Sequence, residues 1–301
     1  MYLGLDLGTS GLRALLVGED GAPVASVSES YQTAHPNPGW SEQDPAVWVA
    51  AVDAVLTRMA AERPADMAAV RGIGVSGHMH GAVCLDAGGA VVRPCILCND
   101  TRSFAEAAAL DAADDVRALS GNIVFPGFTA PKLAWMAAHE PEAFARVAHV
   151  VLPAGYMNFH LTGELFADMS DSAGTSWLDV GARDWSGRLL EAGGMTRAQM
   201  PRLVEGSEVG GQLRRDLAER WGMTGTVAVV GGAGDNALGR RAAGEKPRRR
   251  AGVGRLARAD RRAPALSRRA RRGGRRLCLG RRAVVVVQAA FGRGKPYGTG
   301  R

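Results

Sequence analysis

Residues 227–236 constrain the fold more than any other part of the chain. Four apolar residues, three of them valines, predict a buried strand. Three glycines among the next four residues predict a turn whose bare backbone lies beside a ligand. Asp235 and Asn236 follow at the carboxyl end of this strand, where α/β sheets bind ligands. A carboxylate there can take a proton from a hydroxyl group. The alternative is that Asp235 only caps a following helix.

The amino-terminal residues predict a β-meander with a phosphate-binding turn. Strands are expected at residues 2–7, 12–17 and 23–27, and the first two are joined by Gly8, Thr9, Ser10 and Gly11. The N–H groups and small hydroxyls of such a turn suit phosphate oxygens. Asp6 is expected to hold Mg²⁺ through water, because this ion keeps much of its hydration shell. A plain glycine-rich hairpin is the alternative.

Two later segments offer polar side chains to a ligand. Residues 77–81 form a glycine-bounded loop after a strand at 70–76, and its histidines can reach a polar ligand. A metal site at His78 and His80 would lack a third ligand and is not favoured. Residues 93–102 predict a strand leading into a helix. There Asn99, Asp100 and Arg102 could hydrogen-bond several ligand hydroxyls. The alternative is that Asp100 caps the helix and Arg102 lies on the surface.

Helices are expected at residues 45–62 and 101–119. The apolar face of the first should contain Val47, Val49, Val52, Leu56 and Met59.

Cysteine content and hydropathy exclude some classes of protein. Cys95 and Cys98 form a single C-x-x-C without the second pair that a zinc site needs. No apolar run reaches the roughly 20 residues of a membrane span, and no signal-type leader is visible. We therefore expect a cytoplasmic protein without membrane contact.

Charge divides the chain near residue 237. Residues 237–301 contain 21 basic and two acidic residues, a net charge of +19, whereas residues 1–236 carry 16 basic and 28 acidic residues, a net charge of −12; together they give the net +7 of the whole chain. The arginine clusters of the tail leave no apolar face of helical or strand period, so the tail is expected to be irregular. It also lacks the interleaved aromatic residues of a nucleic-acid-binding arm, and nucleic acid is not an expected partner.

Several segments resemble the FGGY carbohydrate kinases, members of the actin-like ATPase superfamily. Residues 4–10 resemble the first phosphate motif, residues 39–45 and 170–175 follow in the family's order, and residues 77–81 resemble the G-x-M-H-G loop of the xylulokinase branch. Two positions depart from the pattern. Cys98 stands where the family usually has tryptophan, and Ala154 and Gly155 stand where it usually has Lys-Asp.

The resemblance implies an actin-like ATPase (ribonuclease H-like) α/β domain, the N-terminal half of an FGGY kinase, over residues 1–236. The implied reaction transfers the γ-phosphoryl group of ATP, with Mg²⁺, to the 5-hydroxyl of D-xylulose. Asp235 would be the catalytic base and Asp6 would orient the Mg²⁺–phosphate assembly. The remaining implied site residues are Gly8, Thr9, Ser10 and Arg13 for phosphate, and Met79, His80, Asp100 and Asn236 for the sugar. A homodimer of the full-length protein is left open.

Residues 237–301 stand where the family has its nucleotide-binding domain, with a second phosphate loop and an adenosine pocket. We expect either a reading-frame shift near codon 237 or a genuine basic arm, and little kinase activity from this chain. Two other functions stay open: a kinase for glycerol, ribulose or gluconate, and a non-catalytic sugar- or nucleic-acid-binding remnant.

Overall fold

The computed structural model describes residues 1–234, so that Asp235, Asn236 and the tail 237–301 lie outside the described residues. The first half contains β1 (Tyr2–Leu7), β2 (Gly11–Val17), β3 (Pro23–Ser30), β4 (Glu42–Gln43), α1 (Pro45–Glu62), α2 (Pro64–Ala68), β5 (Gly72–Gly77), β6 (Val83–Leu85), β7 (Cys95–Ile96), α3 (Phe104–Ala112) and α4 (Val116–Ser120). The second half contains α5 (Thr129–His139), α6 (Pro141–Phe144), β8 (His149–Val151), α7 (Pro153–Thr162), β9 (Phe166–Asp168), α8 (Met169–Ser172), the 3₁₀ helix η1 (Ala173–Thr175), β10 (Leu178–Asp179), β11 (Asp184–Trp185), α9 (Gly187–Ala192), the 3₁₀ helix η2 (Arg197–Gln199), β12 (Arg202–Val204), β13 (Val209–Gln212), α10 (Arg215–Arg220), β14 (Ala228–Val230) and β15 (Ala233–Gly234).

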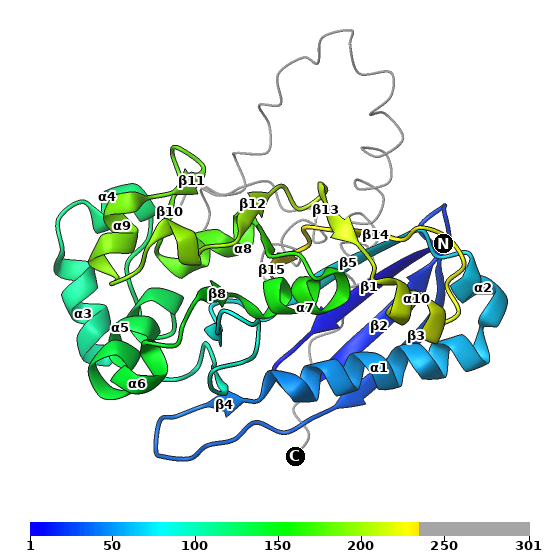
Figure 1. Cartoon of the computed structure of the whole chain (residues 1–301), viewed down its shortest axis with the longest axis horizontal. Helices are drawn as coiled ribbons and strands as arrows, with labels where there is room; N and C mark the ends of the chain where they lie inside the picture. Colours follow the sequence, from blue (N-terminus) through cyan, green and yellow to red (C-terminus); the bar gives the residue numbers. More distant parts are fainter. Residues whose placement is uncertain (235–301) are drawn as a thin grey trace, which may run out of the picture.

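The main sheet has seven strands in the order β13-β14-β5-β1-β2-β3, with β15 also paired to β5 (Figure 1). The predicted meander is confirmed, since β1, β2 and β3 pair antiparallel. Strand β5 runs parallel to β1, and both β14 and β15 run parallel to β5. The carboxyl ends of β1, β5 and β15 therefore meet at one edge of the sheet.

The sheet core forms because its central strands are apolar on both faces. Every residue of β5 is buried, and so are Leu3, Leu5 and Leu7 of β1. Helix α1 lies along the sheet over β2 and β3 (Figure 1). It begins after Asp44, whose side chain accepts a hydrogen bond from the Ala46 N–H at 2.9 Å.

The buried face of α1 differs from the expected one in part. Val47 and Val49 are only half-buried, whereas Trp48 and Val55 are fully buried. The helix therefore turns the Trp48 side of its surface to the sheet, because this side also contains Val52, Leu56 and Met59.

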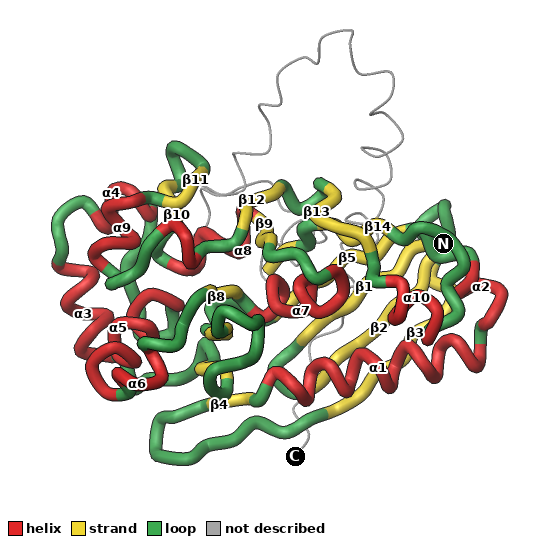
Figure 2. The backbone as a smooth tube through the Cα atoms, viewed as in Figure 1, coloured by secondary structure: helices red, strands yellow, loops and turns green. Residues whose placement is uncertain are grey.

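A second apolar core lies beside the sheet and is built from residues between Ala82 and Met195, on α3, α5, β6, β8 and α9 among others (Figure 2). The single helix expected at residues 101–119 is wrong. It divides into α3 and α4, because Ala113 is extended and Asp115 takes a left-handed conformation with φ 65°.

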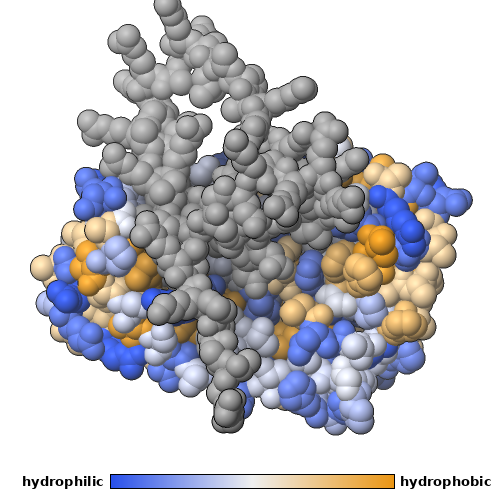
Figure 3. Space-filling view, turned by 180° about the vertical axis from the view of Figure 1, so that it is seen from behind, coloured by the Kyte–Doolittle hydropathy of each residue, from blue (hydrophilic) through white to orange (hydrophobic). Residues whose placement is uncertain are grey.

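Figure 3 shows the molecule from behind. Where the surface of the described residues is visible in this view, hydrophilic and hydrophobic residues are mixed. Among the described residues, no helix combines the length and the apolar character that crossing a membrane requires.

Candidate active site at the carboxyl edge of the sheet

The turn between β1 and β2 is held from the protein side through its carbonyl groups. The Gly8 carbonyl accepts a hydrogen bond from the Tyr31 hydroxyl at 2.6 Å, and the Thr9 carbonyl accepts one from Gln43 Nε2 at 2.6 Å. The Ser10 carbonyl accepts a hydrogen bond from the Tyr31 N–H at 3.2 Å. Because Tyr31 and Gln43 hydrogen-bond these three carbonyl groups, the turn has a fixed shape, as a preformed phosphate-binding turn needs.

Asp6 lies half-buried on β1, next to this turn. In the register of the sheet, Asp6 lies opposite Arg13 of β2 and opposite Ser76 of β5. Burial raises the pKa of Tyr31, and the negative charge of Asp6 raises it further by a smaller amount. Arg13 is exposed, and its Nε donates a hydrogen bond to Ser26 Oγ at 2.9 Å, so its guanidinium is turned toward β3.

The glycine turn after β14 has a different physical reason from the predicted one. A Cβ on Gly232, whose φ is +81°, would stand 2.0 Å from the Val75 carbonyl oxygen, and one on Gly231 would stand 2.6 Å from that of Glu205. The protein's own backbone therefore excludes side chains at these two positions, before any ligand is considered.

Strand β15 brings the end of this turn to β5, the strand next to β1, which leads into the phosphate turn. Ala233 pairs with Ser76 of β5, and Ser76 pairs on its other side with Asp6. Since neighbouring strands lie about 4.8 Å apart, Asp6 and Ala233 are separated by roughly 10 Å across the sheet edge. Asp235 and Asn236 follow Gly234 directly in the sequence and lie outside the described residues.

The loop after β5 contacts this edge through Met79. A Cβ on Gly234 would stand 2.7 Å from Met79 Cγ and 2.8 Å from Asp171 Oδ1. Both side chains therefore lie against Gly234. Asp171 lies on α8, and the structure brings it to this site.

His80 is fixed in one orientation by its backbone conformation and two contacts. Its φ of 68° is left-handed, its Nδ1 lies 2.8 Å from the Gly174 carbonyl oxygen, and its ring stacks on Phe128 with centroids 4.5 Å apart. Burial lowers its pKa to about 4, so the imidazole is neutral at neutral pH. The sequence predicted His80 at this site but not its αL conformation.

His78 belongs to the same loop and is buried. Its ring meets Trp48 edge-on, with centroids 5.3 Å apart, and neither ring nitrogen has a hydrogen-bond partner among the described residues. Burial lowers its pKa to about 3. No cluster of three metal-ligating side chains occurs in residues 1–234.

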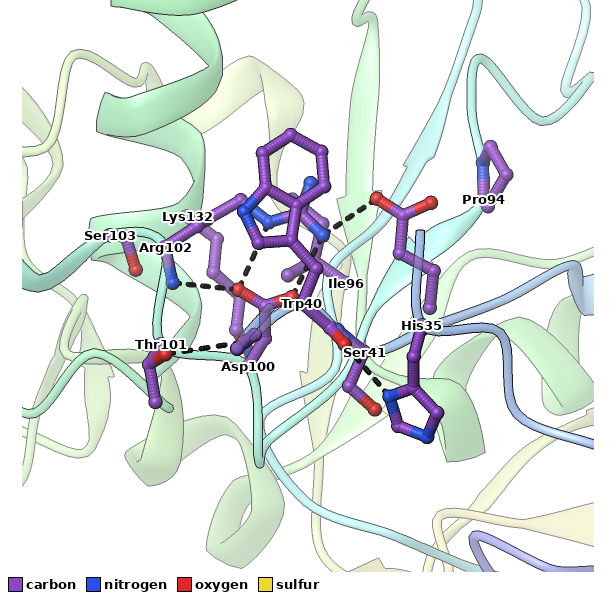
Figure 4. Close-up of polar contacts among 12 residues, drawn as sticks. His35, Trp40, Ser41, Pro94, Ile96, Asp100, Thr101, Arg102, Ser103 and Lys132 are labelled. Atoms are coloured by element: carbon purple, nitrogen blue, oxygen red, sulfur yellow. Dashed lines mark hydrogen bonds and ion pairs between the residues drawn. The ribbon is translucent and has the colours of Figure 1, made fainter. Parts of the chain in front are cut away.

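Asp100 belongs to a buried polar cluster (Figure 4). One carboxylate oxygen accepts from the Ser41 N–H at 2.6 Å and from Arg102 at 2.7 Å, and the other accepts from the Arg102 N–H and Nε. Since a carboxylate accepts about four hydrogen bonds, protein donors fill this capacity. The geometry favours a structural role for Asp100, and its predicted contact with the sugar stays a prediction.

The alternative with Arg102 on the surface is wrong. The Arg102 side chain is only 1% exposed, lies 3.6 Å from the centroid of the Trp40 ring and pairs with Glu42 as well as Asp100. The expected helix cap is wrong too, because α3 begins after Ser103. Arginine is drawn inside because its planar group can stack on an aromatic ring and pair with carboxylates together.

A groove of about 500 Å³ lies beside this cluster and is lined by His35, Pro36, Asn37, Pro38, Gly39, Trp40, Ser41 and Asn99. Asn99 therefore borders a groove, whereas Asp100, its neighbour in sequence, is buried. Asn99 is thus accessible from the groove, whereas Asp100 has a structural position.

Sequence reasoning missed two buried charged groups near the site. Lys132 on α5 is fully buried and donates hydrogen bonds to the carbonyl groups of His80 and Gly127. Asp168 caps α8, and burial raises its pKa to about 6. A signal existed for Lys132, because it is the only lysine before residue 237. The described cysteines Cys84, Cys95 and Cys98 are free.

Comparisons with known proteins identify the family of this chain. Residues 1–240 match the N-terminal domain of the FGGY family of carbohydrate kinases. A xylulose kinase of Escherichia coli K12 is 47% identical over 240 residues, which are 79% of this chain and 49% of that protein; one of Klebsiella pneumoniae is 48% identical over the same shares. A crystal structure of a xyloylose kinase from Brucella ovis superposes with a TM-score of 0.79 at 56% identity, covering 80% of this chain and 50% of that one.

The chain thus spans about half the length of the curated relatives that it matches. A xylulose kinase structure from Rhodospirillum rubrum, 32% identical, superposes with a TM-score of 0.78 over 82% of this chain and 51% of that one. The predicted actin-like α/β fold of an FGGY N-terminal domain is confirmed by these matches. The chain belongs to the FGGY family of carbohydrate kinases.

Proposed function

We propose that this chain supplies the sugar-binding and first phosphate-binding parts of a kinase that transfers the γ-phosphoryl group of ATP to the 5-hydroxyl of D-xylulose. The similarity to xylulose kinases over residues 1–240 supports the sugar. The Met79-His80 loop supports the same choice, because it resembles that of the xylulokinase branch and lies at the edge where β1, β5 and β15 end.

One observation carries this proposal. Asp6 and Ala233 flank Ser76 in three neighbouring parallel strands, so the phosphate turn and the residues just before Asp235 share one edge of the sheet. Phosphoryl transfer depends mainly on positioning and charge stabilisation, which this common edge supplies.

We assign the roles as follows. Asp235 takes the proton from the 5-hydroxyl as that oxygen attacks the γ-phosphoryl group, and Asn236, Met79 and His80 shape the sugar site. Gly8, Thr9 and Ser10 face the phosphates, and Arg13 assists when its guanidinium leaves Ser26.

Asp6 suits a Mg²⁺ ion that keeps its waters. It is a half-buried carboxylate next to the phosphate turn, and Mg²⁺ on a nucleotide needs only one or two protein carboxylates. When bound, the ion would neutralise phosphate charge, and Asp6 would hold it through water.

Calorimetric titration of the 301-residue chain with D-xylulose, D-ribulose, glycerol and D-gluconate tests the proposal. We expect D-xylulose to bind most tightly. Tighter binding of another compound would move the chain to a sister kinase. Binding of no sugar, together with salt-dependent retention on DNA, would support the nucleic-acid-binding remnant.

The role of Asp235 needs a catalytically active relative. There, alanine at the residue aligned with Asp235 should abolish phosphoryl transfer and leave sugar binding unchanged, and asparagine should behave in the same way because it cannot accept the proton. Retained turnover in either variant would remove the residue from this role.

The boundary between a domain at 1–236 and a separate tail at 237–301 is also a proposal. Sequencing of the encoding DNA across codons 230–245 tests it. A shifted frame that restores an FGGY-like reading would assign the basic tail to a frameshift, and no such frame would support a genuine basic arm.

A further inference from the structure

Lys132 lies on α5 with no exposed surface, in the lobe beside the sheet. Its Nζ donates one hydrogen bond to the His80 carbonyl at 2.6 Å and another to the Gly127 carbonyl at 2.8 Å. Residues 1–236 contain 15 arginines and this single lysine. Among the described residues, Lys132 is thus the one cation that is fully buried and donates its hydrogen bonds to two loop carbonyls.

These two carbonyls belong to different loops. His80 lies in the loop between β5 and β6, and Gly127 lies in the loop before α5. The Thr129 hydroxyl donates a further hydrogen bond to the His80 carbonyl at 3.2 Å. The ammonium group therefore ties the loop that contains Met79 and His80 to the loop that contains Phe128, whose ring stacks on His80.

Arginine cannot replace this contact. An ammonium group directs three N–H donors around one nitrogen atom, whereas a guanidinium directs five N–H donors as a planar fork. Arginine also does not lose its proton in proteins. Lysine does so readily when buried. Burial lowers the pKa of Lys132 to about 8, near the upper end of the physiological range.

The charges around Lys132 leave it partly uncompensated. Asp100, the one carboxylate among the charged neighbours that residues 1–234 give to Lys132, is occupied by Arg102 and the Ser41 N–H. The titratable and charged groups that face Lys132 come from β7, the loop after it and the loop after β5, and they are Cys95, Cys98, Asp100, Arg102, His78 and His80.

We propose that Lys132 is a positioning residue for the sugar site: its ammonium group holds the His80 carbonyl to the Gly127 carbonyl through two charge-assisted hydrogen bonds. Loss of its proton leaves a neutral amine that donates weaker hydrogen bonds, which loosens the Met79-His80 loop and weakens sugar binding. This inference rests on the proposed function for the identity of the sugar. The connection between the two loops does not depend on that identity.

The first test needs no ligand. The Cε1–H NMR signal of His80, identified by its loss in His80→Gln, is followed from pH 7 to 9.5. We expect a shift with a midpoint near pH 8, since His80 itself is neutral throughout this range. The midpoint should vanish in Lys132→Arg and Lys132→Met, and it should remain in Arg215→Met, which removes a charge that is 92% exposed. A wild-type signal without this midpoint would overturn the proposal.

The second test measures D-xylulose binding at pH 7 and pH 9. If the unprotonated lysine does not support binding, a midpoint near 8 gives about a tenfold rise in Kd between these values. Lys132→Met should bind weakly at both values, with no pH dependence. Equal Kd values at the two pH values in the wild type, or wild-type affinity in a folded Lys132→Met, would overturn the proposal.

The two tests separate the inference from the proposed function. A pH midpoint at His80 without D-xylulose binding would keep the loop connection and reject D-xylulose as the sugar. D-xylulose binding without the midpoint would keep the proposed function and reject the role of Lys132.

Discussion

Met79 packs on Gly234 so closely that a Cβ on residue 234 would stand 2.7 Å from Met79 Cγ. This contact joins the loop after β5 to the strand that leads to Asp235. It makes the position of one predicted sugar-site residue depend on the absence of a side chain at another position, 155 residues later in the sequence.

We predict that Gly234→Ala displaces Met79 and weakens D-xylulose binding. Overpacking of a closed contact costs about 1 to 3 kcal/mol, so Kd should rise by roughly 5- to 150-fold if the whole cost falls on the bound state. Calorimetric titration at pH 7 measures it. Gly225→Ala is the matched control, because nothing lies within 4 Å of a Cβ at that position. Equal affinities of the two variants would contradict the prediction.

The buried histidines should make the folded protein sensitive to acid. His78 and His80 have folded pKa values of about 3 and 4, below the unfolded value near 6.5, so the unfolded chain binds protons first as the pH falls. Between pH 7 and pH 5 each histidine should lower the free energy of unfolding by about 2 kcal/mol. Urea unfolding at both pH values measures the loss. His78→Phe should remove about half of it, and an unchanged pH dependence in a folded variant would be evidence against this account.

Asp168 should act in the opposite direction over part of this range. Its folded pKa is raised to about 6, above the unfolded value of 3.8, so its contribution to stability is fully present below pH 3.8 and is lost as the pH rises through 6. Acidification from pH 7 to 5 should therefore return about 1 kcal/mol. Asp168→Asn keeps a helix-capping side chain without the titration, and its unfolding free energy should fall more steeply with acid than that of the wild type. Parallel pH profiles of the two proteins would refute the assignment.

Asp100→Ala should reduce the stability of the folded protein more than it reduces the affinity for the sugar. The change leaves the buried Arg102 guanidinium with Glu42 as its remaining carboxylate partner, and breaking a buried pair costs about 3 kcal/mol or more. For a chain of this size, that is a fall in melting temperature of roughly 6 to 12 °C. Thermal unfolding measures it, with Asp100→Asn as the milder control. A large rise in the Kd for D-xylulose without loss of stability would restore Asp100 as a direct sugar ligand.

Local patterns predicted the parts of the fold that depend on near neighbours. The meander of β1, β2 and β3 follows from alternating and continuous apolar runs between glycine turns, and α1 begins and ends at the expected residues. The expected helix at 101–119 failed because a left-handed residue at Asp115 interrupts it, and periodicity does not register such a residue.

Long-range contacts decided what the patterns left open. The helix-capping alternative left Arg102 on the surface, because no local rule anticipates that Trp40, 62 residues earlier, provides a ring for it to stack on. For the same reason Lys132 passed unnoticed, since its partner His80 lies 52 residues away.

By itself, the sequence determined the strands, the glycine turn before Asp235, and the motifs that assign the chain to the FGGY kinases. Only the tertiary structure decided that backbone atoms of Val75 and Glu205 exclude side chains from that turn, and that one buried ammonium group joins two loops. The physical reason is the range of the forces involved. Backbone propensity and apolar periodicity act between near neighbours, whereas close packing and the pairing of buried charge depend on which distant segments the folded sheet brings together.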